Sequence, residues 1–336
     1  MNIAFVISET LCISPYNGIK IQAQTWGEEL KRQGHNVTYV SPWEPQEWGT
    51  FDVIHLIGYS EFIEDLDKLC AFNSKIVFSP IIDSKQNLFL YRLMSYWGCS
   101  KLRLKSINYN IRRAKPYIRH WYVRSEFEYQ YVNKAYGVSP QQISIIPLSY
   151  RITPPVQSCT KKNYCLHVSK LTDSRKNVLR LVKAAQKYNF KLVLAGSISS
   201  EADFLPIKQV IDSSPNISYL GRVSDEKLIS LYQEAKVFAL PSINEGVGLV
   251  AVEAAVCGCD IVVTKVGGPK EYYCGKAYEV NPISIDSIGN SILSAMEDKH
   301  TQPGLSTYVK DHFNLKKCVT ILARSYYDIS KMINRI

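Results

Sequence analysis

The chain has 336 residues with 46% hydrophobic content, which is enough for two domains that each bury a core. Its formal net charge is +10, and no apolar run approaches the roughly 18 residues that a membrane-spanning helix needs. Nine cysteines at irregular spacings argue against a disulfide framework, and six histidines that do not pair with them at ligand spacing argue against a metal site.

The first 150 residues alternate short apolar runs with segments of helical spacing. Apolar residues recur every three or four positions over Ile19–Leu30, which predicts an amphipathic helix, and Ser125–Glu128 has the Ser-x-x-Glu pattern that caps a helix start. Strands separated by helices predict a parallel sheet with crossover connections, so we assign residues 1–150 to a first α/β domain. The runs that predict its strands are Ile3–Ile7, Val37–Val40, Val53–Ile57, Ile76–Phe78, Trp121–Val123 and Ile143–Ile146.

The excess of positive charge lies in one segment of this domain. No Asp or Glu occurs from Ser84 to Ser125, whereas the rest of the chain has 30 basic and 30 acidic residues. Aromatic and aliphatic residues are interleaved with the basic ones, a composition that suits the interface of an anionic bilayer. We expect peripheral contact with an anionic membrane surface and no nucleic-acid partner, since no known binding module surrounds the segment. The alternative is a helix pair that packs its aromatic residues inward and leaves the charges solvated. The ten basic residues are Lys85, Arg92, Lys101, Arg103, Lys105, Arg112, Arg113, Lys115, Arg119 and Arg124.

Residues 149–162, SYRITPPVQSCTKK, interrupt this alternation with two adjacent prolines between polar flanks, and we assign 151–162 as a linker. The alternation then restarts, which predicts a second α/β domain over 163–315 and one long C-terminal helix over 316–336. Because open α/β sheets bind ligands outside the carboxyl ends of their strands, two such domains predict a site at their interface. The predicted strands are Tyr164–Val168, Leu192–Ala195, Val237–Leu240, Ile261–Thr264 and Ala277–Val280, and the predicted helices are Val178–Lys187, Glu226–Glu234, Leu249–Cys257 and Ile283–Met296.

The stretch NEGVGLVAVEAAVCGCDIVVTKVGGPKEYY (244–273) has the pattern of a phosphate site. A predicted strand ends at residues 240–242 and a helix begins near Gly248. The first amides of a helix have no acceptor within it and lie at the positive end of its dipole, which favours bound anions. Glycine at Gly246 and Gly248 lets a ligand approach the backbone. The amides expected to face the ligand are those of Val247, Gly248, Leu249 and Val250.

Two carboxylates flank this turn. Glu245 precedes the glycine turn and would lie beside the chemical group that is attached to the bound phosphates. Glu253 lies about 7–8 Å farther along the helix, where it could accept hydrogen bonds from the hydroxyls of a ribose. The alternative is that Glu253 is a buried structural residue that caps a neighbouring loop.

This stretch resembles the donor-binding signature of retaining glycosyltransferases with the GT-B fold, especially glycosyltransferase family 4. In that signature, two Glu residues are separated by seven others, with a glycine turn after the first. A Glu-Ala-x-x-x-Gly segment and a later Gly-Gly-x-x-Glu segment follow. The matching residues here are Glu245, Glu253, Ala254, Gly258, Gly267, Gly268 and Glu271. The resemblance implies two Rossmann-like α/β/α domains that face each other across a cleft, with the C-terminal helix packed back on the N-terminal domain.

The resemblance extends over nearly the whole chain. PYNGIKIQAQTWGEELKRQGHNVTYVS is similar to the N-terminal glycine loop and helix of the family, which implies that the backbone at Gly18 meets the donor phosphates. In LHVSKLTDSRKN, Lys170 and Lys176 stand where family members have a basic pair on the diphosphate, and the adjacent Arg175 can share that role. The segment whose backbone is implied to hold the base contains Gly221, Arg222 and Val223.

The chain departs from the family pattern at several positions. Val247 stands where an aromatic residue is usual. Many members have a donor-binding histidine after the strand that matches residues 76–78, and Asp83 is a possible substitute here. His55, at the end of an earlier strand, is a second polar candidate for the acceptor side. The alternative is a core histidine whose ring nitrogens are hydrogen-bonded within the fold. Asp65-Leu66-Asp67 matches the Asp-x-Asp pattern of metal-dependent transferases of another fold, but it lies on a predicted helix exterior, so we expect no metal.

The resemblance implies a retaining hexosyltransferase that transfers sugar from a nucleotide-sugar donor to a glycan or lipid-linked acceptor in bacterial surface polysaccharide synthesis. The nucleotide-sugar is a substrate, and no cofactor is expected. Glu245 would position the sugar, while Lys170 and Lys176 would stabilise the leaving diphosphate. The alternatives are a GT-B-type nucleotide-sugar epimerase and a catalytically degenerate accessory subunit that binds nucleotide-sugars. Because the sequence starts with a strand pattern and has no basic n-region, we expect a cytoplasmic location. The basic segment 84–125 suggests peripheral attachment to the cytoplasmic face of the inner membrane.

Overall fold

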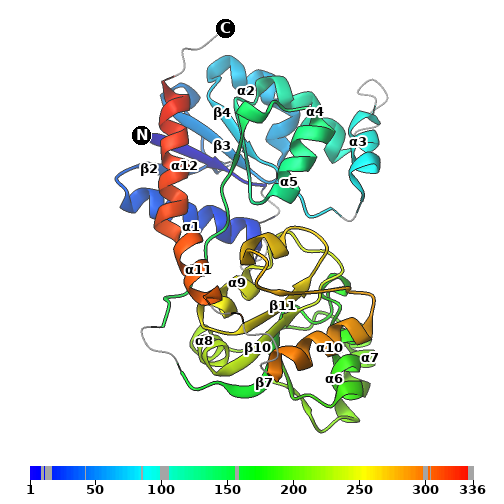
Figure 1. The fold of residues 1–336 in the computed structure, drawn as a ribbon. Helices are drawn as coiled ribbons and strands as arrows, with labels where there is room; N and C mark the ends of the chain where they lie inside the picture. Colours follow the sequence, from blue (N-terminus) through cyan, green and yellow to red (C-terminus); the bar gives the residue numbers. More distant parts are fainter. Residues whose placement is uncertain are drawn as a thin grey trace. The chain divides into compact units, whose positions relative to one another are not determined.

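A computed structural model describes residues 1–8, 11, 17–41, 43–84, 86–98, 106–155, 159–297, 302 and 304–331 (Figure 1). The chain forms two compact units, which are Met1–Ser149 together with Leu315–Ile336, and Tyr150–Asn314. Within the described ranges, each unit is built on a six-stranded sheet whose paired strands all run parallel. This architecture confirms the predicted α/β fold class. None of the described helices is both long and apolar enough to cross a bilayer.

Unit 1 contains both ends of the chain. Its elements are β1 (Asn2–Val6), α1 (Gly18–Arg32), β2 (Asn36–Tyr39), η2 (Trp48–Thr50), β3 (Val53–Ile57), η3 (Glu61–Asp65), α2 (Leu66–Phe72), β4 (Ile76–Ser79), α3 (Leu88–Tyr96), α4 (Ile107–Ala114), η4 (Lys115–Tyr117), β5 (His120–Val123), α5 (Glu126–Gln130), η5 (Tyr131–Ala135), η6 (Pro140–Gln142), β6 (Ile143–Ile145) and α12 (Leu315–Ser330). The strand order is β2-β1-β3-β4-β5-β6.

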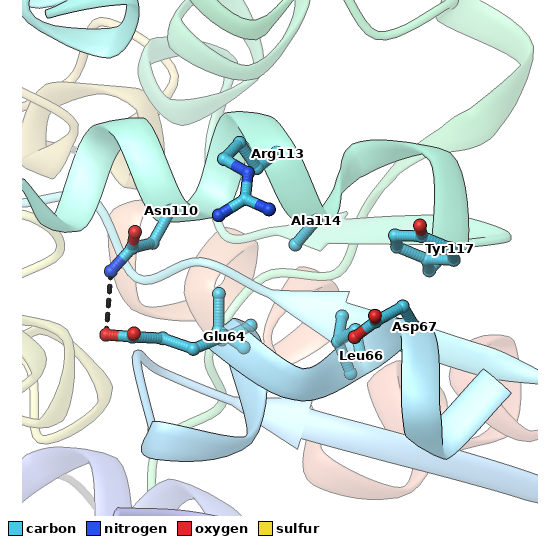
Figure 2. A pocket seen from close by; sticks show the side chains of 8 residues that line it. Glu64, Leu66, Asp67, Asn110, Arg113, Ala114 and Tyr117 are labelled. Carbon is cyan, nitrogen blue, oxygen red and sulfur yellow. Dashed lines mark hydrogen bonds between the residues drawn. The ribbon is translucent and has the colours of Figure 1, made fainter. Parts of the chain in front are cut away.

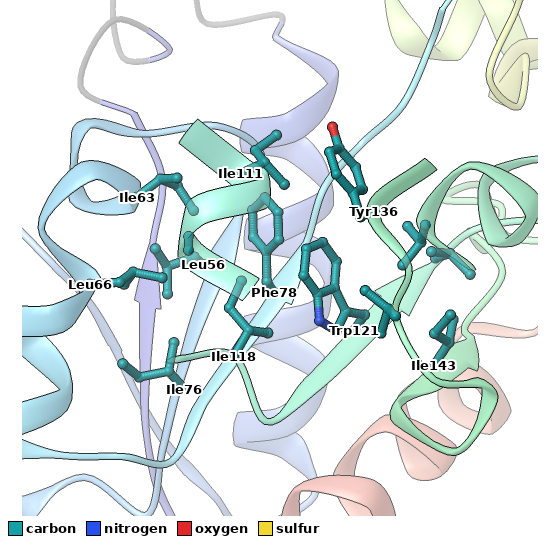
Figure 3. Close-up of a cluster of buried hydrophobic side chains, with 14 of the residues drawn as sticks. Leu56, Ile63, Leu66, Ile76, Phe78, Ile111, Ile118, Trp121, Tyr136 and Ile143 are labelled. Atoms are coloured by element: carbon teal, nitrogen blue, oxygen red, sulfur yellow. The ribbon is translucent and has the colours of Figure 1, made fainter. Parts of the chain in front are cut away.

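Helices cover both faces of this sheet. Ile3 and Phe5 of β1 pack into one core with residues of α1 and α12, while Ala4 and Val6 pack into another with residues of α2, α3 and α4. Strands buried on both faces read as continuous apolar runs, which is why these runs could be recognised in the sequence. In the second core, the rings of Phe78 and Trp121 meet edge to face with centroids 5.2 Å apart (Figure 3).

The long C-terminal helix belongs to unit 1. α12 packs against α1 and β3 and buries its apolar stripe in the same core as Trp26. This placement agrees with the expectation that the last helix returns to the N-terminal domain.

Unit 2 has the strand order β12-β11-β10-β7-β8-β9. Residues of α6, α7 and α10 share a core with β10 residues Val237 and Ala239, whereas Phe238 between them faces the other way and contacts Tyr232 of α8. The elements are β7 (Lys162–Val168), η7 (Ser174–Lys176), α6 (Val178–Tyr188), β8 (Leu192–Ala195), α7 (Glu201–Asp212), β9 (Ile217–Tyr219), α8 (Asp225–Glu234), β10 (Ala235–Leu240), α9 (Leu249–Val256), β11 (Asp260–Thr264), η8 (Pro269–Tyr273), β12 (Tyr278–Val280), α10 (Ile285–Met296) and α11 (Leu305–His312).

Some elements of unit 2 differ from the predicted ones. β7 begins at Lys162, within the segment assigned as linker. α7 and the three-residue strand β9 were not predicted. Pro206 lies inside α7, and proline lacks the amide that an interior helical position needs, so its presence argued against a helix there.

Candidate functional site

The site in unit 2 is built where β7 and β10 lie side by side. Cys165 and Leu166 of β7 pair with Val237 and Phe238 of β10. From β7 the sheet grows through β8 to β9, and from β10 it grows the other way through β11 to β12. The loops after β7 and β10 therefore leave the sheet in opposite directions. In open α/β sheets, this point of reversal is where ligands bind.

Backbone and amide hydrogen bonds fasten the two loops to each other. The amide of Ile243 donates to the carbonyl of Arg175 at 2.7 Å. Asn177, which has the left-handed φ of 61°, donates its side-chain amide to the carbonyls of Pro241 at 2.9 Å and Pro282 at 2.6 Å. These contacts hold the end of the Lys176 loop against the start of the Glu245 loop.

Two of the predicted site residues meet at this junction. Lys176 Nζ lies 2.5 Å from Glu245 Oε2, and the two side chains are only 19% and 13% exposed. Ser242 Oγ donates to the same carboxylate oxygen at 3.2 Å. One cation and one carboxylate are thus held side by side, close to the helix that follows.

The glycine turn after Glu245 leads directly into α9. Gly248 has φ of 73° and precedes the first helical residue, Leu249, without a side-chain cap. A Cβ at Gly248 would lie 2.6 Å from a Leu240 side-chain carbon. The first amides of α9 have no acceptor within the helix, so they can bind an anion.

A third loop closes against this turn. Glu245 and Gly267 form an isolated parallel bridge, and a Cβ at Gly267 would lie 2.3 Å from the Glu245 carbonyl oxygen. Glycine is therefore required at 267, both for this approach and for the φ of 90°. The Gly-Gly motif keeps the backbone of Glu245 in place.

The other predicted donor-side residues are more dispersed. Lys170 is exposed just after β7, whereas Arg175 is held by Asp173 at 2.7 Å. Residues 221–223 follow β9, and the carbonyl of Gly221 accepts the amide of Gly196 at 2.8 Å. Gly18 belongs to unit 1, where it is the first residue of α1.

The sequence did not predict the partner of Glu253. This carboxylate is 1% exposed and lies against Arg151, whose Nε is 2.7 Å from Oε1 and whose Nη2 is 3.2 Å from Oε2. The backbone amide of Arg151 lies 3.4 Å from Oε1. Both oxygens are engaged, and the pair fastens the segment that enters unit 2 to α9. In the sequence, Arg151 stands out only as part of the linker-like segment. No pattern in that segment indicates that Arg151 pairs with Glu253.

On the side of unit 1, His55 proves to be a core residue. It is fully buried, with Nδ1 2.5 Å from the Tyr326 hydroxyl and Nε2 2.8 Å from Ser79 Oγ. Burial lowers the pKa of His55 to about 3, so the ring is neutral near pH 7. With both nitrogens engaged inside the fold, His55 is no longer a candidate for acceptor binding.

Asp83 is held by the polar core of the same unit. Its carboxylate lies 2.7 Å from Nη2 of Arg124, a buried side chain that also pairs with Glu128. The Asp83 side chain is still 35% exposed, so it can contact a ligand only from this fixed position.

A cavity of about 170 Å³ lies in the helical layer of unit 1, between η3–α2 and α4–η4 (Figure 2). Asn110 donates to Glu64 at its rim at 2.9 Å. Asp67 of the Asp-x-Asp pattern lines it, whereas Asp65 pairs with Lys68 at 2.8 Å. Among the residues that the structure describes, no group of three or more His, Cys, Asp or Glu could hold a metal ion.

Comparison with known proteins finds a family match in unit 2. Residues 152–312 match the family Glycosyl transferases group 1. O-antigen chain mannosyltransferase B of Escherichia coli is 30% identical over 179 residues, which cover 49% of this chain and 46% of that protein. The chain therefore matches about half the length of this relative.

Solved structures support the fold of the whole chain. Sucrose-phosphate synthase from Thermosynechococcus elongatus superposes with a TM-score of 0.76 at 17% identity, covering 98% of this chain and 99% of that one. Alr3699/HepE from Anabaena in complex with UDP superposes with a TM-score of 0.70 at 16% identity, covering 98% and 100%. The chain has the GT-B fold.

The buried Arg151–Glu253 pair should stabilise unit 2. We expect Arg151→Ala to lower the free energy of unfolding by about 1.5–3 kcal/mol, because it leaves a buried carboxylate without its charged partner. The combined variant Arg151→Met/Glu253→Gln should recover part of that loss, since it removes the unpaired charge. Urea unfolding of both variants measures this, and equal stability of Arg151→Ala and wild type would show that Glu253 does not depend on Arg151.

Proposed function

We propose that the chain is a glycosyltransferase whose unit 2 holds a nucleotide-sugar at the junction of the loops after β7 and β10. The sugar passes, with retention of anomeric configuration, to a glycan or lipid-linked acceptor of the kind used in surface polysaccharide synthesis. The family match of residues 152–312 supports the donor half of this proposal, because it covers every donor-side candidate in unit 2.

The proximity of Lys176, Glu245 and the start of α9 carries the proposal. Negative charge grows on the diphosphate as the bond to the sugar breaks, and fixed donors aimed at that charge stabilise the transition state. Lys176, the exposed Lys170 and the first amides of α9 supply cationic or dipolar groups without a metal ion. Glu245, held between Lys176 and Ser242, is the carboxylate available to orient the sugar hydroxyls.

Nucleotide binding has a further requirement at Glu253. If this carboxylate accepts the ribose hydroxyls, Arg151 must give up at least one of the two oxygens that it holds. Arg151 is 36% exposed and can move toward solvent, whereas Glu253 cannot. The ribose would then replace one charged hydrogen bond by another, so the carboxylate stays partnered throughout.

The acceptor class is inferred from the Escherichia coli relative, whose name describes an O-antigen chain mannosyltransferase. A catalytically inactive subunit that binds nucleotide-sugars is the second candidate. It is favoured by the lack of the family's histidine after residues 76–78, since Asp83, the possible substitute, is tied to Arg124. Turnover measurements with a panel of nucleotide-sugars separate the two, because only the enzyme releases nucleoside diphosphate.

Replacing either proposed phosphate-binding lysine should weaken nucleotide binding. We expect Lys170→Ala and Lys176→Ala each to raise the Kd for nucleoside diphosphate about ten- to a hundredfold, since a charged hydrogen bond contributes about 1.5–3 kcal/mol. Titration calorimetry with UDP and GDP measures this. Lys183→Ala, an exposed lysine on α6, is the matched control. Unchanged affinity in both folded variants would remove these lysines from the site.

Glu245 should matter for turnover more than for nucleotide affinity. We expect Glu245→Gln to lower the transfer or hydrolysis rate by about 100-fold or more, because it loses the charge that faces the reacting sugar. Nucleoside diphosphate should bind within about twofold of wild type, since the isosteric amide can still contact Ser242 and Lys176. Full turnover in this variant would contradict the role given to Glu245.

A further inference from the structure

One helix of unit 1 exposes an unusual amount of apolar surface. Phe89, Leu93, Tyr96 and Trp97 are 78%, 47%, 53% and 73% exposed. Phe89, Leu93 and Tyr96 are three or four positions apart and so lie on one face of α3, and Trp97 follows directly after the helix. These four residues are named here the α3 strip. Leu90 is also 42% exposed beside it. α3 lies at the edge of unit 1 beside α4 (Figure 1).

The opposite face of α3 is firmly fixed. The hydroxyls of Tyr91 and Tyr136 lie 2.8 Å apart, and Ser95 Oγ donates to the carbonyl of Ala135 at 3.3 Å. Within the strip, the Tyr96 ring lies 3.4 Å from the Arg112 guanidinium, which holds this half-exposed ring beside α4. The strip is therefore presented by an anchored helix, and Tyr91, the aromatic residue of α3 that packs inward, is not part of it.

The structure divides the basic residues of the acid-free segment 84–125 into two groups. Some serve the fold: Arg124 pairs with Asp83 and Glu128, and Arg112 donates to the carbonyl of Ala135 at 2.8 Å. Arg119 and Lys115 likewise donate to backbone carbonyls, at 3.1 and 3.0 Å. Arg92 and Arg113, by contrast, are exposed. Arg92 lies on α3 itself, one position before Leu93, and Arg113 lies on α4. Lys85, Lys101, Arg103 and Lys105 lie outside the described residues.

We propose that the α3 strip, with Arg92 beside it, docks unit 1 on the surface of an anionic lipid bilayer. Aromatic and aliphatic side chains next to a cation suit the boundary between headgroups and acyl chains, where the rings enter and the cation meets anionic lipid. The segment has no acidic residue to repel such a surface. If two copies of the chain met through this strip, their positive charges would repel each other. Charge complementarity therefore favours an anionic bilayer over a second copy as the partner of the strip.

This inference is independent of the proposed transfer reaction, and vesicle co-sedimentation of the full chain tests it. The vesicles are pure phosphatidylcholine or phosphatidylcholine with phosphatidylglycerol, each at low and high salt. The strip variant is Phe89→Ser/Trp97→Ser. Its matched control, Phe72→Ser/Trp43→Ser, removes one phenylalanine and one tryptophan of the same unit that are 69% and 90% exposed elsewhere. Arg92→Glu tests the charge, and far-ultraviolet circular dichroism checks that all variants fold.

We expect the wild-type chain to bind the phosphatidylglycerol vesicles and to lose binding at high salt. The strip variant should bind about tenfold more weakly or worse, the control like wild type, and Arg92→Glu more weakly only on anionic vesicles. Absence of wild-type binding, or equal binding by the strip variant, would overturn the proposal. So would sedimentation equilibrium that shows a dimer abolished by the strip variant while no vesicle binding occurs, because the strip would then be an interface between copies.

Discussion

The site in unit 2 depends on one topological constraint, the adjacency of β7 and β10 at the point where the sheet changes its direction of growth. Because the chain runs on from β7 to β8 and from β10 to β11, on opposite sides of this point, the loops that follow the two strands meet there. They bring Lys176 and Glu245 into contact, and hydrogen bonds from Ile243 and Asn177 fix the loops. The same geometry aims the start of α9 at the junction. Every chemical role proposed for this unit rests on that arrangement.

Charge compensation makes the site stable before any ligand enters. Lys176 neutralises Glu245, and Arg151 neutralises Glu253, so neither weakly solvated carboxylate is left without a partner. An unpaired charge in such places would cost several kcal/mol. In the proposed function, a donor that binds both carboxylates would exchange these internal partners for its own groups. Donor binding would then depend on the position of Arg151, which lies where the chain enters unit 2.

The sequence predicted the α/β class, most strands and the glycine turn that leads into α9, because buried parallel strands and phosphate turns have strong local patterns. Lys176 was marked only by the family resemblance, and its contact with Glu245 was not predicted. It did not predict Arg151 as the partner of Glu253, since the two are far apart in the chain and no local pattern links them. His55 was ambiguous for a similar reason, because its partner Tyr326 comes from the last helix. The acid-free segment was visible as composition, but only the fold separated Arg112 and Arg124, which stabilise unit 1, from the exposed α3 strip.

The central claim is that the junction of the β7 and β10 loops binds the nucleoside diphosphate of a sugar donor. Hydrogen–deuterium exchange of the full chain, with and without saturating UDP or GDP sugars, tests it most directly. The account predicts that a nucleotide-sugar which binds will slow exchange in residues 170–177 and 243–250. Saturable binding that leaves both segments unchanged and protects other parts of the chain would contradict it.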